Sequence, residues 1–426
     1  MEQNNSRARR RKKPGAKWRV PPPIRYGRED LPGQSALEED VAGIGGELWH
    51  MLRAVQLWAR ARPDSRDALF VEAGATWRDS TPAEIGAAVA VLERMAADPV
   101  RTSAEEISEA CRRIAVWADG EGAGGTALEF AQVRADLMQE DALAAHLVGR
   151  MARRRGESAR AESWLRHAVY LGRASRDLVA YARANLGLGN LFAERGSLPA
   201  AQRVFLRTLR AATRAKNGEI AAMALHDLFQ VAAQRGQIAR ASRYAQAAAR
   251  RYGARHARLP VLYKDVAFLW IESGWFAPAL EVLVALQDLV EGIPERRLLH
   301  SAMARAAGGV GDTLSYNRAL GELGGLVAGA EAGEGVAPAL LNLAHGAASL
   351  RRDGDARVYA TRAIAAARAS REGKVRLAAE DLLEGLEAQA TGRGAESAVR
   401  PDAAPVVDEI AREAVEMLAP AGGRSA

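Results

Sequence analysis

The chain has 426 residues, enough for two or three ordinary domains or for one array that grows by adding units. Its hydrophobic fraction of 48% excludes disorder over most of the length, and its single cysteine excludes an internal disulfide or a cysteine-based metal cluster. The formal charge of +7 suggests nucleic-acid binding, but residues 1–30 hold ten basic and three acidic residues, so the other residues sum to zero. The charge excess therefore belongs to the N-terminal segment and not to the body of the chain.

Residues 1–34 are polar, basic and rich in proline, and we predict that they form a disordered tail. Basic residues interleaved with aromatics are typical of proteins that bind single-stranded nucleic acid, although a solubilising tail has the same composition. The candidate nucleic-acid contacts are Arg9, Arg10, Arg11, Lys12, Lys13, Lys17, Trp18 and Arg19. The tail lacks the apolar stretch of a secretory signal, and no later segment has the length and apolarity of a membrane helix, so the sequence predicts a cytoplasmic protein without a membrane partner.

Residues 35–101 are expected to form an N-terminal helical region. Apolar residues recur at helical spacing over residues 48–57 and again over residues 85–95, and Asp98-Pro99 ends the second run. The glycine-rich stretch 43–46 is placed before the first of these helices. No compact three-helix pattern with a tight turn is evident, which argues against a helix-turn-helix DNA-binding domain here.

A recurring glycine turn is the most informative feature of the next part of the chain. Four stretches of one pattern, such as Arg195-Gly196-Ser197-Leu198-Pro199-Ala200-Ala201, are centred on Gly156, Gly196, Gly236 and Gly274, which lie 40, 40 and 38 residues apart. A period in this range marks a repeat protein, whose units bury their apolar faces only by stacking on one another. Weaker copies surround Gly122, Gly311 and Gly354.

Each repeat reads as two helices joined at the glycine, which can adopt the left-handed conformation that ends the first helix. Five residues later comes a small residue that lets the two helices approach closely: Ala161, Ala201, Ala241 and Ala279. The glycine-rich segments 120–125 and 308–311 are interpreted as turns between helices.

The second unit carries the pattern best, with Leu188, Gly189, Phe192, Gly196, Ala201 and Phe205. This order of residues resembles the tetratricopeptide repeat, with a longer period and without the family's tryptophan and terminal proline. The resemblance implies an all-α fold, a right-handed α-solenoid of antiparallel helix pairs, over six or seven units in residues 102–391. A linker over 392–405 and a C-terminal helix and tail over 406–426 are expected to follow.

Motifs of catalysis and of cofactor binding are missing from the sequence, which has no paired-histidine zinc motif, no phosphate-binding loop and no nucleophile elbow. Cys111 stands beside Arg112 and Arg113, which could lower the pKa of a thiol, but a buried cysteine used as a small apolar residue is the favoured interpretation. We expect neither an enzyme nor a cofactor or metal.

In the tetratricopeptide family the first helices line a concave groove, and the groove residues lie about ten and six positions before the turn glycine. Transfer by position selects one pair of residues in each of four repeats: His146 and Arg150, Leu186 and Asn190, His226 and Gln230, and Lys264 and Phe268. Arg153 and Arg183 lie a turn away and add positive charge, so the strip is rich in donors, and acids are sparse on it in the sequence. The resemblance implies the groove, and its Arg, His, Lys, Asn and Gln donors favour an extended peptide that is acidic or ends in a free carboxylate. The alternative is that the strip is simply a polar surface, since any helix face outside the core is polar.

The function expected from the sequence is that of an adaptor or scaffold that binds a protein or peptide in this groove. The alternative is a regulator associated with nucleic acid, which uses the basic tail for attachment and the array for sensing a peptide. Binding that weakens steeply with salt and is lost on removal of residues 1–30 would favour the alternative.

Overall fold

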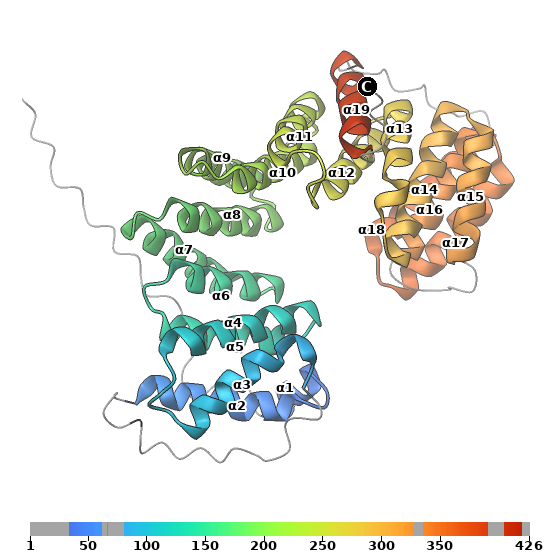
Figure 1. Cartoon of the computed structure of the whole chain (residues 1–426). Helices are drawn as coiled ribbons and strands as arrows, with labels where there is room; N and C mark the ends of the chain where they lie inside the picture. The colour runs from blue at the N-terminus through green and yellow to red at the C-terminus, as the bar shows by residue number, and fades with distance from the viewer. Residues whose placement is uncertain (1–33, 62–65, 67–80, 328–334, 391–403, 420–426) are drawn as a thin grey trace, which may run out of the picture. The chain divides into compact units, whose positions relative to one another are not determined.

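The computed structural model describes residues 34–61, 66, 81–327, 335–390 and 404–419. Every regular element in these residues is helical (Figure 1). The chain divides into two compact units, of which the first ends at Gly196 and the second begins at Ser197.

The described residues of unit 1 form eight α-helices. They are α1 (Gln34–Asp40), α2 (Gly45–Arg60), α3 (Ala83–Ala97), α4 (Ala104–Gly120), α5 (Gly124–Leu137), α6 (Ala142–Arg154), α7 (Ser158–Ala174) and α8 (Leu178–Glu194). Helices α4 and α5 pack as a pair, α6 and α7 as the next pair, and α8 lies against both α7 and α6. The N-terminal helices α1 and α2 contact α5.

Unit 2 contains the remaining helices. They are α9 (Leu198–Arg214), α10 (Gly218–Gln234), α11 (Ile238–Tyr252), α12 (Leu259–Glu272), α13 (Phe276–Leu286) with the short 3-10 helix η2 (Gln287–Leu289), α14 (Ile293–Val310), α15 (Thr313–Val327), α16 (Val336–Ser349), α17 (Asp353–Ala369), α18 (Gly373–Ala390) and α19 (Ala404–Leu418). Consecutive helices pair, α14 also packs on α16, and α19 contacts α11, α12 and α13. The predicted all-α architecture of stacked helix pairs is confirmed: the chain has a tetratricopeptide-like helical repeat fold.

Short local signals begin and end these helices. Gly156 and Gly236 adopt positive φ angles of 75° and 67° after α6 and α10, as the repeat pattern predicts. Asp177 accepts hydrogen bonds from the backbone N–H groups of Val179 and Ala180, both at 2.9 Å, and so caps the start of α8. Asp141 and Asn217 cap α6 and α10 in the same way, so the first helices α6, α8 and α10 each begin at a side-chain N-cap.

Small side chains lie where the two helices of a repeat meet: Ala161, Ala201, Ala241 and Ala279 are all fully buried. Glycine takes this role where helices approach most closely. A Cβ atom added to Gly149 of α6 would lie 2.6 Å from Cγ of Leu165 in α7. The predicted use of small residues for close helix contact is confirmed.

Three expectations about glycines are wrong. Gly308 and Gly309 lie inside α14 rather than in a turn, because α16 approaches α14 there: a Cβ on Gly308 would be 2.3 Å from the carbonyl oxygen of Gly346. Gly354 lies within α17, and Arg351 takes the left-handed turn position instead, with φ 61°. The stretch 43–46 does not precede the first helix, since α1 comes before it and α2 begins at Gly45.

Candidate binding surface

In unit 1 the predicted strip residues come from two helices that pack side by side. His146, Arg150 and Arg153 lie on α6, and Arg183 and Asn190 lie on α8. His146 is half-buried beneath Gly187 of α8, where an added Cβ would lie 3.4 Å from its Nε2 atom. The glycine leaves space mainly for Leu165 of α7, since an added Cβ would lie 2.8 Å from its Cδ2 atom, whereas the contact with the imidazole ring would be of ordinary length.

The surroundings of His146 keep it neutral. Burial lowers the pKa of His146 to about 4, and the positive charges of Arg150, Arg183 and Arg153 contribute in the same direction. A neutral imidazole keeps one nitrogen as a donor and one as an acceptor at physiological pH. The ring can therefore hydrogen-bond to a peptide without adding charge.

Carboxylates accompany the arginines of α6, in contrast to the acid-poor strip expected from the sequence. Asp119, near the end of α4, accepts from Arg150 Nη2 at 3.3 Å and from Arg154 Nη1 at 3.0 Å. Arg153 pairs with Glu194 of α8. The acids were missed because they come from the ends of neighbouring first helices, 31 to 41 residues away in sequence.

The cluster keeps a positive excess after these pairings. Arg150, Arg153, Arg154 and Arg183 are four cations, and Asp119 and Glu194 are two anions. Arg183 is exposed, and the side chains of Arg150 and Arg154 retain 38% and 57% of their accessible surface. We name these four arginines with His146 and Asn190 the arginine cluster.

In unit 2 the predicted donors converge on an acid of the chain itself. His226 Nε2 and Gln230 Nε2, both on α10, lie 3.1 Å and 2.7 Å from Oδ2 of Asp265 on α12. Lys264 is the half-buried neighbour of Asp265 in the sequence. Asp265 was not predicted, and in this unit it already satisfies the two donors that were assigned to a peptide.

A polar network that the sequence did not reveal joins α12, α14 and α16. Arg305 Nη1 donates to Glu272 Oε1 at 2.6 Å and to Asn342 Oδ1 at 3.3 Å, and Asn342 Nδ2 donates to Ser301 Oγ at 3.2 Å. Burial lowers the pKa of nearby His345 to about 4, and the charge of Arg305 lowers it further. The sequence could have indicated Arg305 by its position, because Arg305 lies six residues before Gly311, just as Arg150 lies six residues before Gly156.

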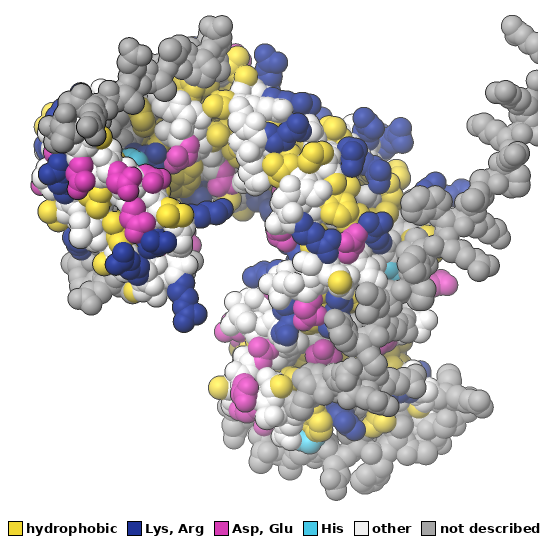
Figure 2. Space-filling model, turned by 180° about the vertical axis from the view of Figure 1, so that it is seen from behind, with side chains coloured by type: hydrophobic (Ala, Val, Ile, Leu, Met, Phe, Trp, Pro, Cys, Tyr) yellow, Lys and Arg dark blue, Asp and Glu magenta, His cyan; other side chains and the backbone are white. Residues whose placement is uncertain are grey.

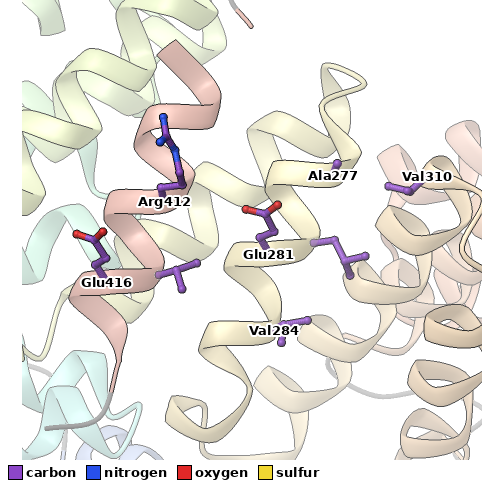
Figure 3. A pocket seen from close by; sticks show the side chains of 8 residues that line it. Ala277, Glu281, Val284, Val310, Arg412 and Glu416 are labelled. Carbon is purple, nitrogen blue, oxygen red and sulfur yellow. The ribbon is translucent and has the colours of Figure 1, made fainter. Parts of the chain in front are cut away.

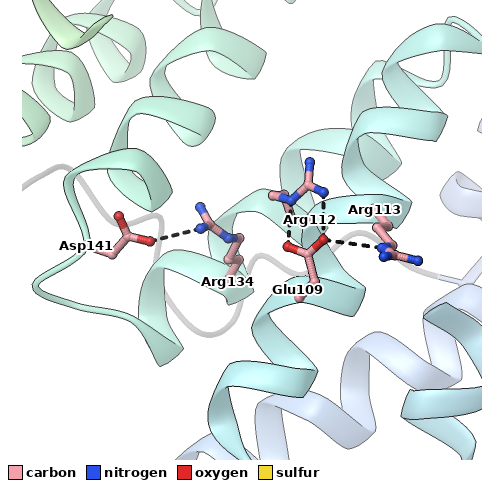
Figure 4. Close-up of polar contacts among 5 residues, drawn as sticks. All are labelled: Glu109, Arg112, Arg113, Arg134 and Asp141. Atoms are coloured by element: carbon pink, nitrogen blue, oxygen red, sulfur yellow. Dashed lines mark hydrogen bonds and ion pairs between the residues drawn. The ribbon is translucent and has the colours of Figure 1, made fainter. Parts of the chain in front are cut away.

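The surroundings of Cys111 agree with its interpretation as a core residue. The thiol is fully buried, and burial raises its pKa to about 12. Arg112 and Arg113 bind Glu109 instead of the sulfur and hold the pKa of that carboxyl at about 2 (Figure 4). In the same figure Arg134 of α5 donates to Asp141, the N-cap of α6, at 2.9 Å and so ties two consecutive helix pairs together.

Basic and acidic side chains are interspersed over the face shown in Figure 2, with hydrophobic side chains between them. In the part of the chain that the structure describes, no three histidine, cysteine or carboxylate side chains are grouped to hold a metal ion. None of the described helices combines the length and apolar character needed to cross a bilayer. The candidate nucleic-acid contacts from Arg9 to Arg19 lie outside the described residues.

Comparison with known proteins yields helical structures of low sequence identity. No family model matches the chain, and no curated protein sequence matches it. A Rap protein in complex with Competence and Sporulation Factor aligns at 12% identity over 82% of this chain and 99% of its own, with a TM-score of 0.42. BtubC (BKLC) from P. vanneervenii aligns at 15% identity over 74% and 96%, with a TM-score of 0.32.

A circular tandem repeat protein with a novel repeat topology aligns at 19% identity over 90% of this chain and 97% of its own, with a TM-score of 0.19. The class of the protein, an all-α tetratricopeptide-like helical repeat protein, rests on the helix pairs and turns of the chain itself.

Proposed function

We propose that the chain is a non-enzymatic adaptor that binds a protein or an extended peptide on the first-helix faces of its array. The arginine cluster of unit 1 is the main contact, and its ligand is an acidic segment or a free C-terminal carboxylate. The observation that carries this proposal is the positive excess of four arginines over two carboxylates around a neutral histidine.

The chemistry of the cluster supports an anionic ligand. The planar guanidinium group matches a carboxylate in two parallel hydrogen bonds, and Asp119 and Glu194 already bind the cluster through carboxylates. Arg183 and Arg154 are exposed and offer the remaining charge. Asn190 on α8 supplies an amide that can both donate to and accept from a peptide backbone.

Unit 2 contributes less charge to this function. Asp265 takes the donors of His226 and Gln230, and Glu272 takes Arg305. A neutral or mixed segment of the partner suits this surface better than an acidic one, because Asp265 and Glu272 already accept from His226, Gln230 and Arg305. We therefore assign the anionic part of the ligand to unit 1.

A capture experiment tests the proposal. The wild-type chain and an Arg150→Ala/Asn190→Ala variant are used to retain proteins from the native cell, which are then identified by mass spectrometry. The partners should be lost from the variant, because each charged or bidentate contact contributes roughly 1–3 kcal/mol to binding. Arg173→Ala is the matched control. Arg173 is an exposed arginine of unit 1, but it lies on α7, the second helix of its pair, and therefore outside the proposed surface.

Retention of the same partners by the double variant, with circular dichroism equal to that of the wild type, would place the binding surface elsewhere. Attachment to nucleic acid through the tail is the alternative, supported by the charge excess of residues 1–30. It predicts binding to a single-stranded oligonucleotide that weakens steeply with salt and is absent after removal of those residues.

A further inference from the structure

Helix α19 packs on helices that lie far before it in the sequence. The 13 residues 391–403 separate it from α18, which packs on α17 and α16, whereas α19 contacts α11, α12 and α13 (Figure 1). The other main contacts of unit 2 join helices that are consecutive or next but one. Helix α19 therefore packs on the array without continuing its order of stacked helices.

The contact has the form of an amphipathic helix in a groove. One face of α19 is buried, at the helical spacing i, i+3, i+4, i+7 and i+11: Val407, Ile410, Ala411, Ala414 and Leu418. Beside this face Glu413 accepts from Arg250 Nε and from Gln246 Nε2 of α11, both at 2.8 Å. Arg250 is 61% exposed, so this charged contact lies at the rim, where it fixes the register of the helix and would repel a cation in place of Glu413.

An open hollow beside α19 shows that this helix fills the groove only in part (Figure 3). The hollow has a volume of about 670 Å³, and its lining comes from α13, α14 and α19: Ala277, Leu280, Glu281, Val284, Val310, Arg412, Val415 and Glu416. Val284 and Val310 remain 53% and 49% exposed. On this side α19 presents the charged Arg412 and Glu416 together with Val415.

We propose that α11, α12 and α13, with the edge of α14, form a binding groove for an amphipathic helix of a partner protein, and that α19 is its internal and incompletely fitting occupant. The partner helix carries apolar residues at the positions of the buried face of α19 and an acid at the position of Glu413. It also carries apolar residues where α19 has Arg412 and Glu416, and so covers Val284 and Val310. Its advantage over α19 is this additional buried surface, which offsets the high local concentration of a tethered helix.

A fluorescent peptide tests the groove in the full-length chain. The probe is residues 404–418 with Arg412→Leu and Glu416→Leu, and its fluorescence anisotropy is measured with the wild-type chain and with an Ile410→Asp variant that weakens the internal helix. The Kd should be at least about tenfold lower for the variant, because the internal competitor is weakened. A probe without the two leucines should bind the variant more weakly.

A charge exchange provides the matched control for register. A probe that also carries Glu413→Arg should bind the Ile410→Asp chain weakly, and its affinity should return when that chain also carries Arg250→Glu. Equal affinity of the first probe for the wild-type and Ile410→Asp chains would overturn the proposal. Absence of binding to both chains, or indifference to Glu413→Arg, would overturn it as well.

Hydrogen exchange of the wild-type chain decides the question if the Ile410→Asp chain does not fold. An occupant that leaves its groove exchanges its amides by local opening, so α19 should lose protection well before α12, on which it packs. Equal protection of α19 and α12 would make α19 a permanent part of the core and would exclude its displacement by a partner.

Discussion

His146 and His345 are histidines held neutral by burial beside an arginine, one in each unit. The pKa of each is about 4, below that of an exposed histidine, with burial as the larger cause and neighbouring arginines as the second. Protons therefore bind more tightly to the unfolded chain than to the folded one. Stability from these residues is complete above the pKa of a free histidine and is lost as the pH falls toward 4.

Lowering the pH from 7 to 5 should reduce the free energy of unfolding of unit 1 by about 2 kcal/mol through His146 alone. The variant His146→Gln cannot titrate and should lack this part of the loss. Urea unfolding at both pH values measures the change in the free energy of unfolding of each protein. Hydrogen exchange of the amides of α6 and α8 then shows whether the change belongs to the helices around His146. Parallel pH profiles of the two proteins would mean that folding does not lower the pKa of His146.

Close helix packing at the element scale depends on glycines that the repeat pattern does not mark. Gly308 of α14 faces Gly346 of α16, and a Cβ on Gly346 would in turn lie 2.7 Å from the carbonyl oxygen of Ala304. The two backbones approach so closely that neither position has room for a methyl group. Fixed backbone atoms cannot move aside as the end of a flexible side chain can.

Gly308→Ala should therefore destabilise unit 2 by about 1–3 kcal/mol. At an exposed helix position the same substitution would stabilise the helix by about 1 kcal/mol. Gly321→Ala in α15 is the matched control, because an added Cβ there meets nothing within 4 Å. The control should be neutral or stabilising by up to about 1 kcal/mol. Chemical denaturation of the two variants measures both effects, and a stable Gly308→Ala protein would contradict the close approach of α14 and α16.

Neighbour-to-neighbour packing governs stability at the scale of the whole molecule. Within unit 2 helix α9 packs on α10 and α10 on α11, while α16, α17 and α18 form a separate set of contacts. A local defect should therefore spread to adjacent helices and weaken with distance along the array. Helix α19 is the exception, since it connects α11, α12 and α13 to the end of the chain.

Phe205→Ala tests this local cooperativity, because Phe205 of α9 is 1% exposed and its truncation should cost about 3–5 kcal/mol. Hydrogen exchange should show the largest loss of protection in α9 to α11 and a much smaller loss in α16 to α18. A uniform loss from α9 to α18 would instead indicate a single cooperative core, as in an ordinary globular domain.

The sequence by itself determined the helix pairs and their turns, because these depend on residues close together in the chain. A glycine such as Gly156 ends one helix, a buried alanine such as Ala161 follows five residues later, and both recur at a period long enough to be recognised. The positions of strip residues on their helices followed from the same register. Local conformation and small-residue packing are therefore readable from one sequence.

Only the tertiary structure decided which groups face those residues. Asp119 reaches Arg150, Asp265 reaches His226, and both contacts join helices more than 30 residues apart. Gly308 and Gly311 look alike in the sequence, yet one is required by the approach of a distant helix and the other by its own backbone angle. The docking of α19 likewise depends on a groove formed by three helices, so an amphipathic pattern alone could not assign its place.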